Sequence, residues 1–112
     1  MIKVTPTTIR ASYELLAQLP PFNRWKKPPI KNIAFVAFRA TDCYGEYEPS
    51  HIIRVSSTKV GHLDTLLRTV AHEMLHMVRA CRGDPHWDQH DEVFAEMAAR
   101  VAKNTGFDPK EL

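Results

Sequence analysis

Residues 62–82 read HLDTLLRTVAHEMLHMVRACR and carry the clearest helical pattern of the chain. Apolar side chains recur in this stretch at intervals of three and four residues, which is the spacing of one face of an α-helix. These residues are Leu63, Leu66, Leu67, Val70, Met74, Met77 and Val78. Gly83 follows and is typical of the position at which a helix ends. We therefore expect a long helix from about His62 to Arg82 with one apolar face.

Inside this helix, residues 72–76 form the pattern HExxH, with His72, Glu73 and His76 at its defined positions. Side chains four residues apart lie on the same face of a helix, so the two imidazoles could bind one Zn²⁺ ion, with the glutamate beside the water that the metal activates. Both histidines fall almost opposite the apolar face, which argues against an ordinary core role for them. A solvated polar face without metal is the alternative interpretation.

The first half of the chain predicts a helix followed by a small sheet. Thr5 followed by Pro6 is typical of a helix start, and Pro20-Pro21 ends this first helix. Short apolar or interrupted stretches predict three strands, at residues 33–39, 43–47 and 51–56. The order helix, small sheet, helix, helix is an α+β fold, and 112 residues are the length of one domain.

The last helix is expected to begin at Asp84-Pro85, because aspartate is a common N-cap and proline is favoured in the first helical turn. Gly106 predicts its end. Its apolar face would comprise Val93, Phe94, Met97, Ala98, Val101 and Ala102. His90 precedes Phe94 by one helical turn and would therefore point from this inward face toward the polar face of the preceding helix.

A catalytic zinc site needs a third protein ligand and one open position. Four downstream residues could supply this ligand: His86, His90, Glu92 and Glu96. Arginines at positions 79 and 82 exclude the metzincin pattern, which has glycine and histidine there. We favour His90 because of its place on the inward face. His86, one turn earlier, is the runner-up as a ligand or as a residue that supports one.

Composition is that of an ordinary globular protein. Hydrophobic residues make up 44% and charged residues 25% of the chain, which excludes a disordered tail. The longest uncharged apolar run is far too short for a membrane helix, and we expect a cytoplasmic protein with no membrane partner. Two distant cysteines, Cys43 and Cys81, exclude a four-cysteine zinc ribbon and a disulfide framework. The net charge of +2 is too small to imply nucleic-acid binding by itself.

Three segments together resemble the SprT-like (Spartan) zinc metalloprotease domain: residues 53–56 (IRVS), 66–76 (LLRTVAHEMLH) and 90–94 (HDEVF). In that family a strand that ends in serine leads to a helix bearing HExxH, and a third histidine begins an HGxxF-type motif. The resemblance implies that His72, His76 and His90 are the zinc ligands and that Glu73 is the catalytic base. Asp91 stands where the family has glycine.

The resemblance covers about residues 51–98 and implies a zincin-like minimal catalytic domain over residues 1–112. Its members are hydrolases that act on DNA-associated or DNA-crosslinked proteins, so we expect a zinc-dependent metallopeptidase with a protein or peptide substrate. Glu73 would take a proton from water activated by zinc and pass it to the leaving amine. The donor that stabilises the developing oxyanion stays open among Tyr44, Tyr47, His62 and His86.

Two other functional classes stay open. One is a zinc hydrolase of a non-peptide bond, because an HExxH site activates water without specifying the electrophile. The other is a non-catalytic zinc-binding domain, which Glu73 disfavours, because a structural site needs no base.

One basic segment, residues 20–32, is the candidate for a weak DNA contact. Its cations and aromatic residues are Phe22, Arg24, Trp25, Lys26, Lys27 and Lys31. Such a composition can contact phosphate and stack on a base. The alternative, which we favour, is a solvated loop whose aromatic side chains fasten it to the core.

Overall fold

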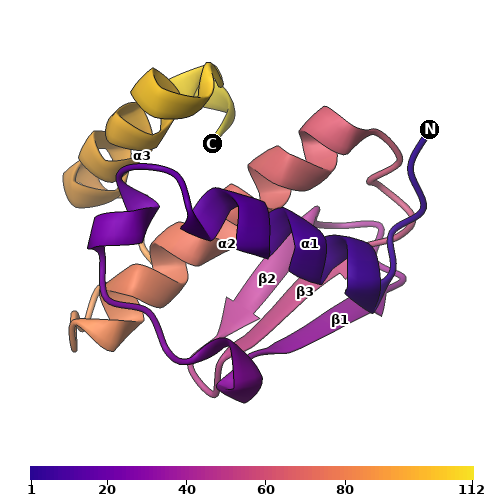
Figure 1. Cartoon of the computed structure of the whole chain (residues 1–112), viewed down its shortest axis with the longest axis horizontal. Helices are drawn as coiled ribbons and strands as arrows, with labels where there is room; N and C mark the ends of the chain where they lie inside the picture. The colour runs from indigo at the N-terminus through magenta and orange to yellow at the C-terminus, as the bar shows by residue number, and fades with distance from the viewer.

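Three α-helices and one three-stranded sheet make up the fold (Figure 1), which the computed structural model describes over residues 1–112. The helices are α1 (Pro6–Ala17), α2 (Leu63–Cys81) and α3 (Glu92–Thr105). The strands are β1 (Ala34–Phe38), β2 (Gly45–Glu48) and β3 (Ile52–Ser56). Short 3-10 helices lie at Phe22–Arg24, Ile30–Asn32 and Pro109–Glu111. The α+β class with three helices and a small sheet is therefore confirmed.

The sheet has the strand order β1-β3-β2. β3 pairs in parallel with β1 and antiparallel with β2, where Gly45 lies opposite Val55 and Glu48 opposite Ile52. β2 and β3 form a hairpin whose connection includes His51 with a positive φ of 68°. Because β2 is the last strand in the order, one of its edges has no strand partner.

The start of α1 follows the sequence prediction. The Thr5 side chain accepts a hydrogen bond from the Thr8 backbone N–H at 3.2 Å, and the Thr8 hydroxyl accepts one from the Thr5 N–H at 2.9 Å. This reciprocal capping satisfies two backbone donors at the helix start, where no intrahelical acceptor exists. Pro6 occupies the first helical turn.

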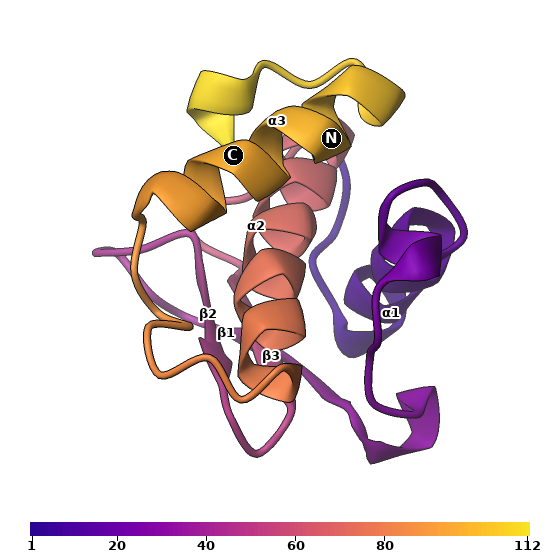
Figure 2. The same ribbon diagram turned by 90° about the vertical axis from the view of Figure 1, so that its left-hand side faces the viewer.

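α2 runs through the middle of the molecule, with α1 on one side, β2 and β3 on the other and α3 crossing near it (Figure 2). Because it is covered on several sides, its buried surface is wider than the single apolar face expected. Ala71 and Leu75, which lie outside the expected face, are fully buried. Leu63, which was placed on that face, is 55% exposed at the first turn.

The basic segment before β1 is anchored by its aromatic side chains. Phe22 is fully buried, and the Trp25 ring meets it edge-on with ring centroids 5.6 Å apart. The Lys27 ammonium group donates to the Phe22 and Trp25 carbonyls. These contacts agree with the interpretation of the segment as a loop fastened to the core.

The expected start of the last helix at Asp84-Pro85 is wrong, because α3 begins at Glu92 and residues 84–91 form a loop of turns. The Asp84 carboxylate accepts a hydrogen bond from the His86 backbone N–H at 2.8 Å. This contact is the local turn that aspartate commonly closes two residues ahead of itself. Asp84 thus caps a turn and not a helix.

Asp91 is the N-cap of α3, and its Oδ1 accepts a hydrogen bond from the Phe94 N–H at 3.0 Å. His86 and His90 therefore lie in the 84–91 loop, and the placement of His90 on the inward face of a helix is also wrong. His90 comes directly before the N-cap, so its position depends on the loop.

No helix of this chain combines the length and the apolar composition needed to cross a membrane.

The packing of α2 predicts that Leu75→Ala destabilises the protein by about 2–5 kcal/mol, because Leu75 is fully buried and its truncation leaves a cavity. Leu63→Ala, the matched control on the same helix, should change stability by no more than about 0.5 kcal/mol. Urea unfolding followed by circular dichroism measures both. A larger cost for Leu63→Ala than for Leu75→Ala would contradict the observed packing of α2.

Candidate metal centre

Three histidine side chains converge at the face of α2 that the 84–91 loop crosses. His72 and His76 extend from α2 four residues apart, and His90 reaches them from the loop. The Nε2 atoms of His72 and His76 lie 3.2 Å apart, those of His72 and His90 3.1 Å, and those of His76 and His90 3.2 Å. The three residues that the sequence proposed as ligands are thus brought together and could hold a metal ion.

The triangle of nitrogen atoms has the size that a metal ion requires. Zinc binds imidazole nitrogen at about 2.0–2.1 Å, so two ligands of a tetrahedral site lie about 3.3–3.4 Å apart. The observed separations of 3.1–3.2 Å are close to this value on all three sides. One ion above the triangle could therefore contact all three nitrogens and keep a fourth position open.

The orientation of His76 is set by a backbone group of the loop. Its Nδ1 lies 2.7 Å from the Trp87 carbonyl oxygen. A carbonyl only accepts, so Nδ1 donates this hydrogen bond, and in the neutral imidazole Nε2 carries the free electron pair. Such a bond from the second ring nitrogen fixes the orientation of metal-binding histidines and makes them stronger ligands.

Phe94, near the start of α3, packs against the whole cluster. Its ring centroid lies 4.9 Å from those of His72 and His90 and 5.1 Å from that of His76. Phe94 is itself buried. It therefore forms an apolar wall that keeps water from one side of the three imidazoles.

The surroundings keep the imidazoles in the form that binds metal. Burial, together with the neighbouring His76 and His90, lowers the pKa of His72 to about 4. Burial likewise lowers the pKa of His76. Both side chains are therefore neutral at neutral pH, and metal ions bind the neutral imidazole.

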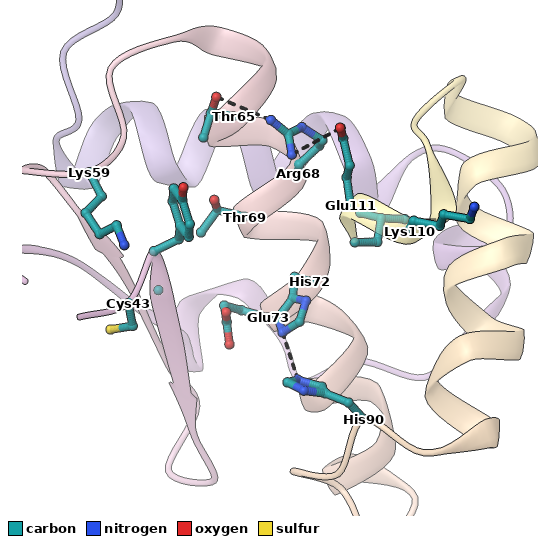
Figure 3. Close-up of a pocket in the computed structure, with 13 residues that line it drawn as sticks. Cys43, Lys59, Thr65, Arg68, Thr69, His72, Glu73, His90, Lys110 and Glu111 are labelled. Carbon is teal, nitrogen blue, oxygen red and sulfur yellow. Dashed lines mark hydrogen bonds and ion pairs between the residues drawn. The ribbon is translucent and has the colours of Figure 1, made fainter. Parts of the chain in front are cut away.

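Glu73 is an isolated buried carboxyl group beside the cluster. It is 5% exposed, and Figure 3 shows its carboxylate directed into the space near His72 and His90. Burial, together with the smaller effect of the negative charge of Glu46, raises its pKa to about 8. No hydrogen bond from the protein stabilises its charged form. A cation held by the histidines would favour that charged form, so the Glu73 carboxyl group would be ionised when metal is bound.

A cavity of about 610 Å³ opens in front of Glu73 (Figure 3). Its lining comes from the start of β2, the polar side of α2, the loop residue His90 and residues 110–112. Lys59 and Arg68 also line it. The cavity joins the histidine cluster to solvent and is large enough to admit part of a substrate.

Gly45 allows β2 to approach the site closely. A Cβ atom at this position would lie 2.7 Å from the Arg54 carbonyl oxygen, 2.8 Å from Thr69 Cγ2 and 3.4 Å from Glu73 Oε2. No larger residue fits without moving backbone, so the glycine brings the edge strand against the helix that carries HExxH.

The other ligand candidates lie outside the cluster. Glu92 is exposed at the first turn of α3, and Glu96 lines a separate small hollow beside Trp25. His86 lies in the first turn of the 84–91 loop and does not line the cavity. The cluster of potential metal ligands comprises His72, His76 and His90.

Of the four candidate oxyanion donors, Tyr44 lines the cavity. Tyr47 is buried and its hydroxyl lies 3.2 Å from His51 Nδ1, which places its polar end elsewhere. His62 is the residue before α2 and, like His86, does not line the cavity.

Four residues that shape the site were not predicted from the sequence. They are Gly45, Arg79, Trp87 and Phe94, the last in its role as an apolar wall of the histidine cluster. Arg79 is buried and pairs with Asp84 and Asp91. A signal for it was present, because Asp84 and Asp91 lie at the two ends of a segment that must cross its helix face. Trp87 acts through its backbone carbonyl group, which every residue has, so its residue type could not predict this contact.

Comparison with protein-family models, with curated proteins and with solved structures finds no match for this chain.

The raised pKa of Glu73 predicts a pH-dependent stability in the metal-free protein. Its pKa is about 8 in the folded state and near 4.5 when exposed, so between these values the folded state keeps a proton that the unfolded state loses. The contribution of this group to stability therefore decreases as pH rises from about 4.5 to 8. Glu73→Gln should remove this decrease and exceed wild type at pH 8 by a few kcal/mol, on the order expected from the shift.

Urea unfolding in the presence of a chelator, at pH 5 and at pH 8, measures this difference. Glu96→Gln, at an exposed position on α3, is the control and should keep the wild-type pH dependence. A Glu73→Gln variant whose advantage over wild type does not grow between the two pH values would contradict the assigned burial of the carboxyl group.

Proposed function

We propose that this protein is a zinc-dependent metallopeptidase of the SprT-like, zincin type. The observation that carries the proposal is the convergence of three imidazole Nε2 atoms within 3.1–3.2 Å of one another beside Glu73, a buried carboxyl group that faces the same cavity. The histidines offer a metal three neutral ligands, and the carboxyl group offers a proton acceptor next to it.

The ligand set favours zinc. Three histidine nitrogens with one position open to a cavity are the arrangement of catalytic zinc sites, whereas structural sites close all four positions with protein ligands. Neither cysteine belongs to the cluster of potential ligands. His72, His76 and His90 would hold the ion, which when bound supplies Lewis acidity near neutral pH.

The side chains around the ion would each contribute a different part of the reaction. Glu73 accepts a proton from the attacking water and returns it to the leaving amine, which requires that it be ionised at the start of the cycle. Phe94 and the buried side of α2 limit water to the cavity side. Tyr44, at the cavity wall, is the candidate to donate a hydrogen bond to the developing oxyanion.

The position of β2 favours a peptide substrate over a small molecule. One edge of this strand has no partner, and its first residue, Gly45, lies against Thr69 and Glu73. An extended peptide can add to such an edge through main-chain hydrogen bonds, with little dependence on its side chains. A peptide bound in this way would lead its backbone past the carboxyl group of Glu73.

An action on DNA-associated proteins is part of the proposal and rests on the sequence resemblance. The basic segment offers it limited support, because Phe22 is buried and Lys27 is engaged with backbone carbonyls. Arg24, Lys26 and Lys31 are its exposed cations. A DNA contact through this segment would therefore be electrostatic and strongly dependent on salt.

Metal analysis tests the ligand assignment. We expect one zinc ion per chain in the wild type and loss of zinc in His90→Ala, since two histidines alone hold zinc weakly. His86→Ala, which removes a histidine four residues away in the same loop, is the matched control and should retain zinc. Elemental analysis after dialysis measures both, and loss of zinc from His86→Ala with retention in His90→Ala would reverse the assignment.

Glu73→Gln tests the catalytic role. The variant should lose casein hydrolysis by at least about 10²–10⁴-fold, which is the usual contribution of a general base, while it still binds zinc. Glu96→Gln is the control at an exposed position on α3 and should keep wild-type activity. Wild-type zinc protein that cleaves neither casein nor proteins bound to DNA would exclude the peptidase assignment, and an active Glu73→Gln variant would place the base elsewhere.

A further inference from the structure

A single arginine lies buried beneath the 84–91 loop. Arg79 is on α2, one turn after His76, and its side chain is 1% exposed. Its Nε donates to the Asp84 carboxylate at 2.8 Å, and one terminal nitrogen donates to the Gln89 carbonyl at 3.0 Å. Its two terminal nitrogens also donate to the two carboxylate oxygens of Asp91 at 2.8 and 3.0 Å. One guanidinium group thus holds both ends of the loop.

The residues held in this way surround two groups of the metal centre. At one end, the Asp84 backbone carbonyl accepts a hydrogen bond from the Trp87 N–H at 3.2 Å, and the Trp87 carbonyl accepts one from His76 Nδ1 at 2.7 Å. At the other end, Gln89 and Asp91 are the two neighbours of His90 in the chain. All three bonds to these neighbours start from the same planar group, which limits rotation of the backbone that carries His90.

We propose that Arg79 is a positioning residue that holds the 84–91 loop so that His90 and the Trp87 carbonyl meet His72 and His76 in the geometry of the metal site. The proposal rests on the proposed function, since it concerns the same metal centre. Arg79 touches none of the three imidazoles through a hydrogen bond; it acts through Asp91 and Gln89 on one side of the loop and through Asp84 on the other.

The nature of the interaction favours a geometric role over general stabilisation. A buried ion pair must offset the loss of hydration of its charges, and well-packed apolar side chains are often as stable in its place. An arginine adds a defined orientation of its partner, because its planar group binds a carboxylate through two parallel bonds. Asp91 is also the N-cap of α3, so the same carboxylate fixes the end of the loop to both helices.

The experiment measures zinc affinity by competition with a chelating dye in wild type, Arg79→Lys, Asp91→Asn and His90→Ala. Arg79→Lys keeps the positive charge and loses the two parallel bonds. Asp91→Asn keeps the size and the capping ability of the side chain and loses its charge. Both should weaken zinc binding about 10–100-fold, as changes to residues that orient metal ligands do. Circular dichroism of the metal-free variants verifies that they are folded. If Arg79→Lys does not fold, the zinc affinity of Asp91→Asn tests the proposal.

A double variant separates positioning from a general effect on the fold. If Asp91 acts by holding His90, then Asp91→Asn should have no further effect on zinc affinity once His90 is replaced by alanine. The visible spectrum of the cobalt-substituted Asp91→Asn protein should also differ from that of wild type, because a displaced histidine changes the coordination of the ion. Arg54→Lys is the matched control, since Arg54 also binds two carboxylates, those of Glu46 and Glu48, and should keep wild-type affinity.

Wild-type zinc affinity in the folded Arg79→Lys and Asp91→Asn variants would overturn the inference and leave the proposed function in place. Equal losses from Asp91→Asn with and without His90 would also overturn it, since the effect would then not pass through this histidine. Absence of zinc binding by the wild type would overturn the proposed function itself, and the inference with it.

Discussion

The site depends on one packing constraint: the 84–91 loop and Phe94 cover the polar face of α2, which would otherwise face water. A solvated pair of histidines on an amphipathic helix would be mobile and would bind protons at ordinary pH. Under this cover the imidazole of His76 is oriented by a backbone carbonyl, and burial keeps His72 and His76 neutral. The geometry of the three imidazoles is therefore a property of the contact between a helix and a loop, as much as of the HExxH pattern.

Buried polar groups in this region fall into two kinds. Arg79 and the Nδ1 atom of His76 have hydrogen-bond partners, as buried polar groups with a structural role do. Glu73 is different, because its carboxyl group is almost fully buried, faces a cavity and has a pKa raised to about 8. Burial of an ionisable group without a partner is unfavourable. Such groups concentrate at functional sites, and this carboxyl group is the observation that favours the proposed catalytic centre over a purely structural metal site.

Those parts of this protein that follow from local rules could be predicted from its residues alone. The α+β class, the capped start of α1 and the long central helix with both histidines on one face could be predicted, because caps and helical spacing involve residues only a few positions apart. His90 was also selected from the sequence, but on a helix start that the structure contradicts. His90 does belong to the histidine cluster, but the helical position from which it was selected is wrong.

The way in which His90 reaches His72 and His76 depends on contacts between distant parts of the chain. Both Asp84 and Asp91 are plausible helix caps by residue type, but in the structure Asp91 caps α3, Asp84 closes a turn, and Arg79 of α2 binds the carboxylates of both. The contribution of the Trp87 carbonyl was equally hidden, since every residue has such a group. These contacts join residues that are distant along the chain, or they act through the backbone. Neither periodicity nor residue type predicts them, because both describe only relations between residues that are close together in the sequence.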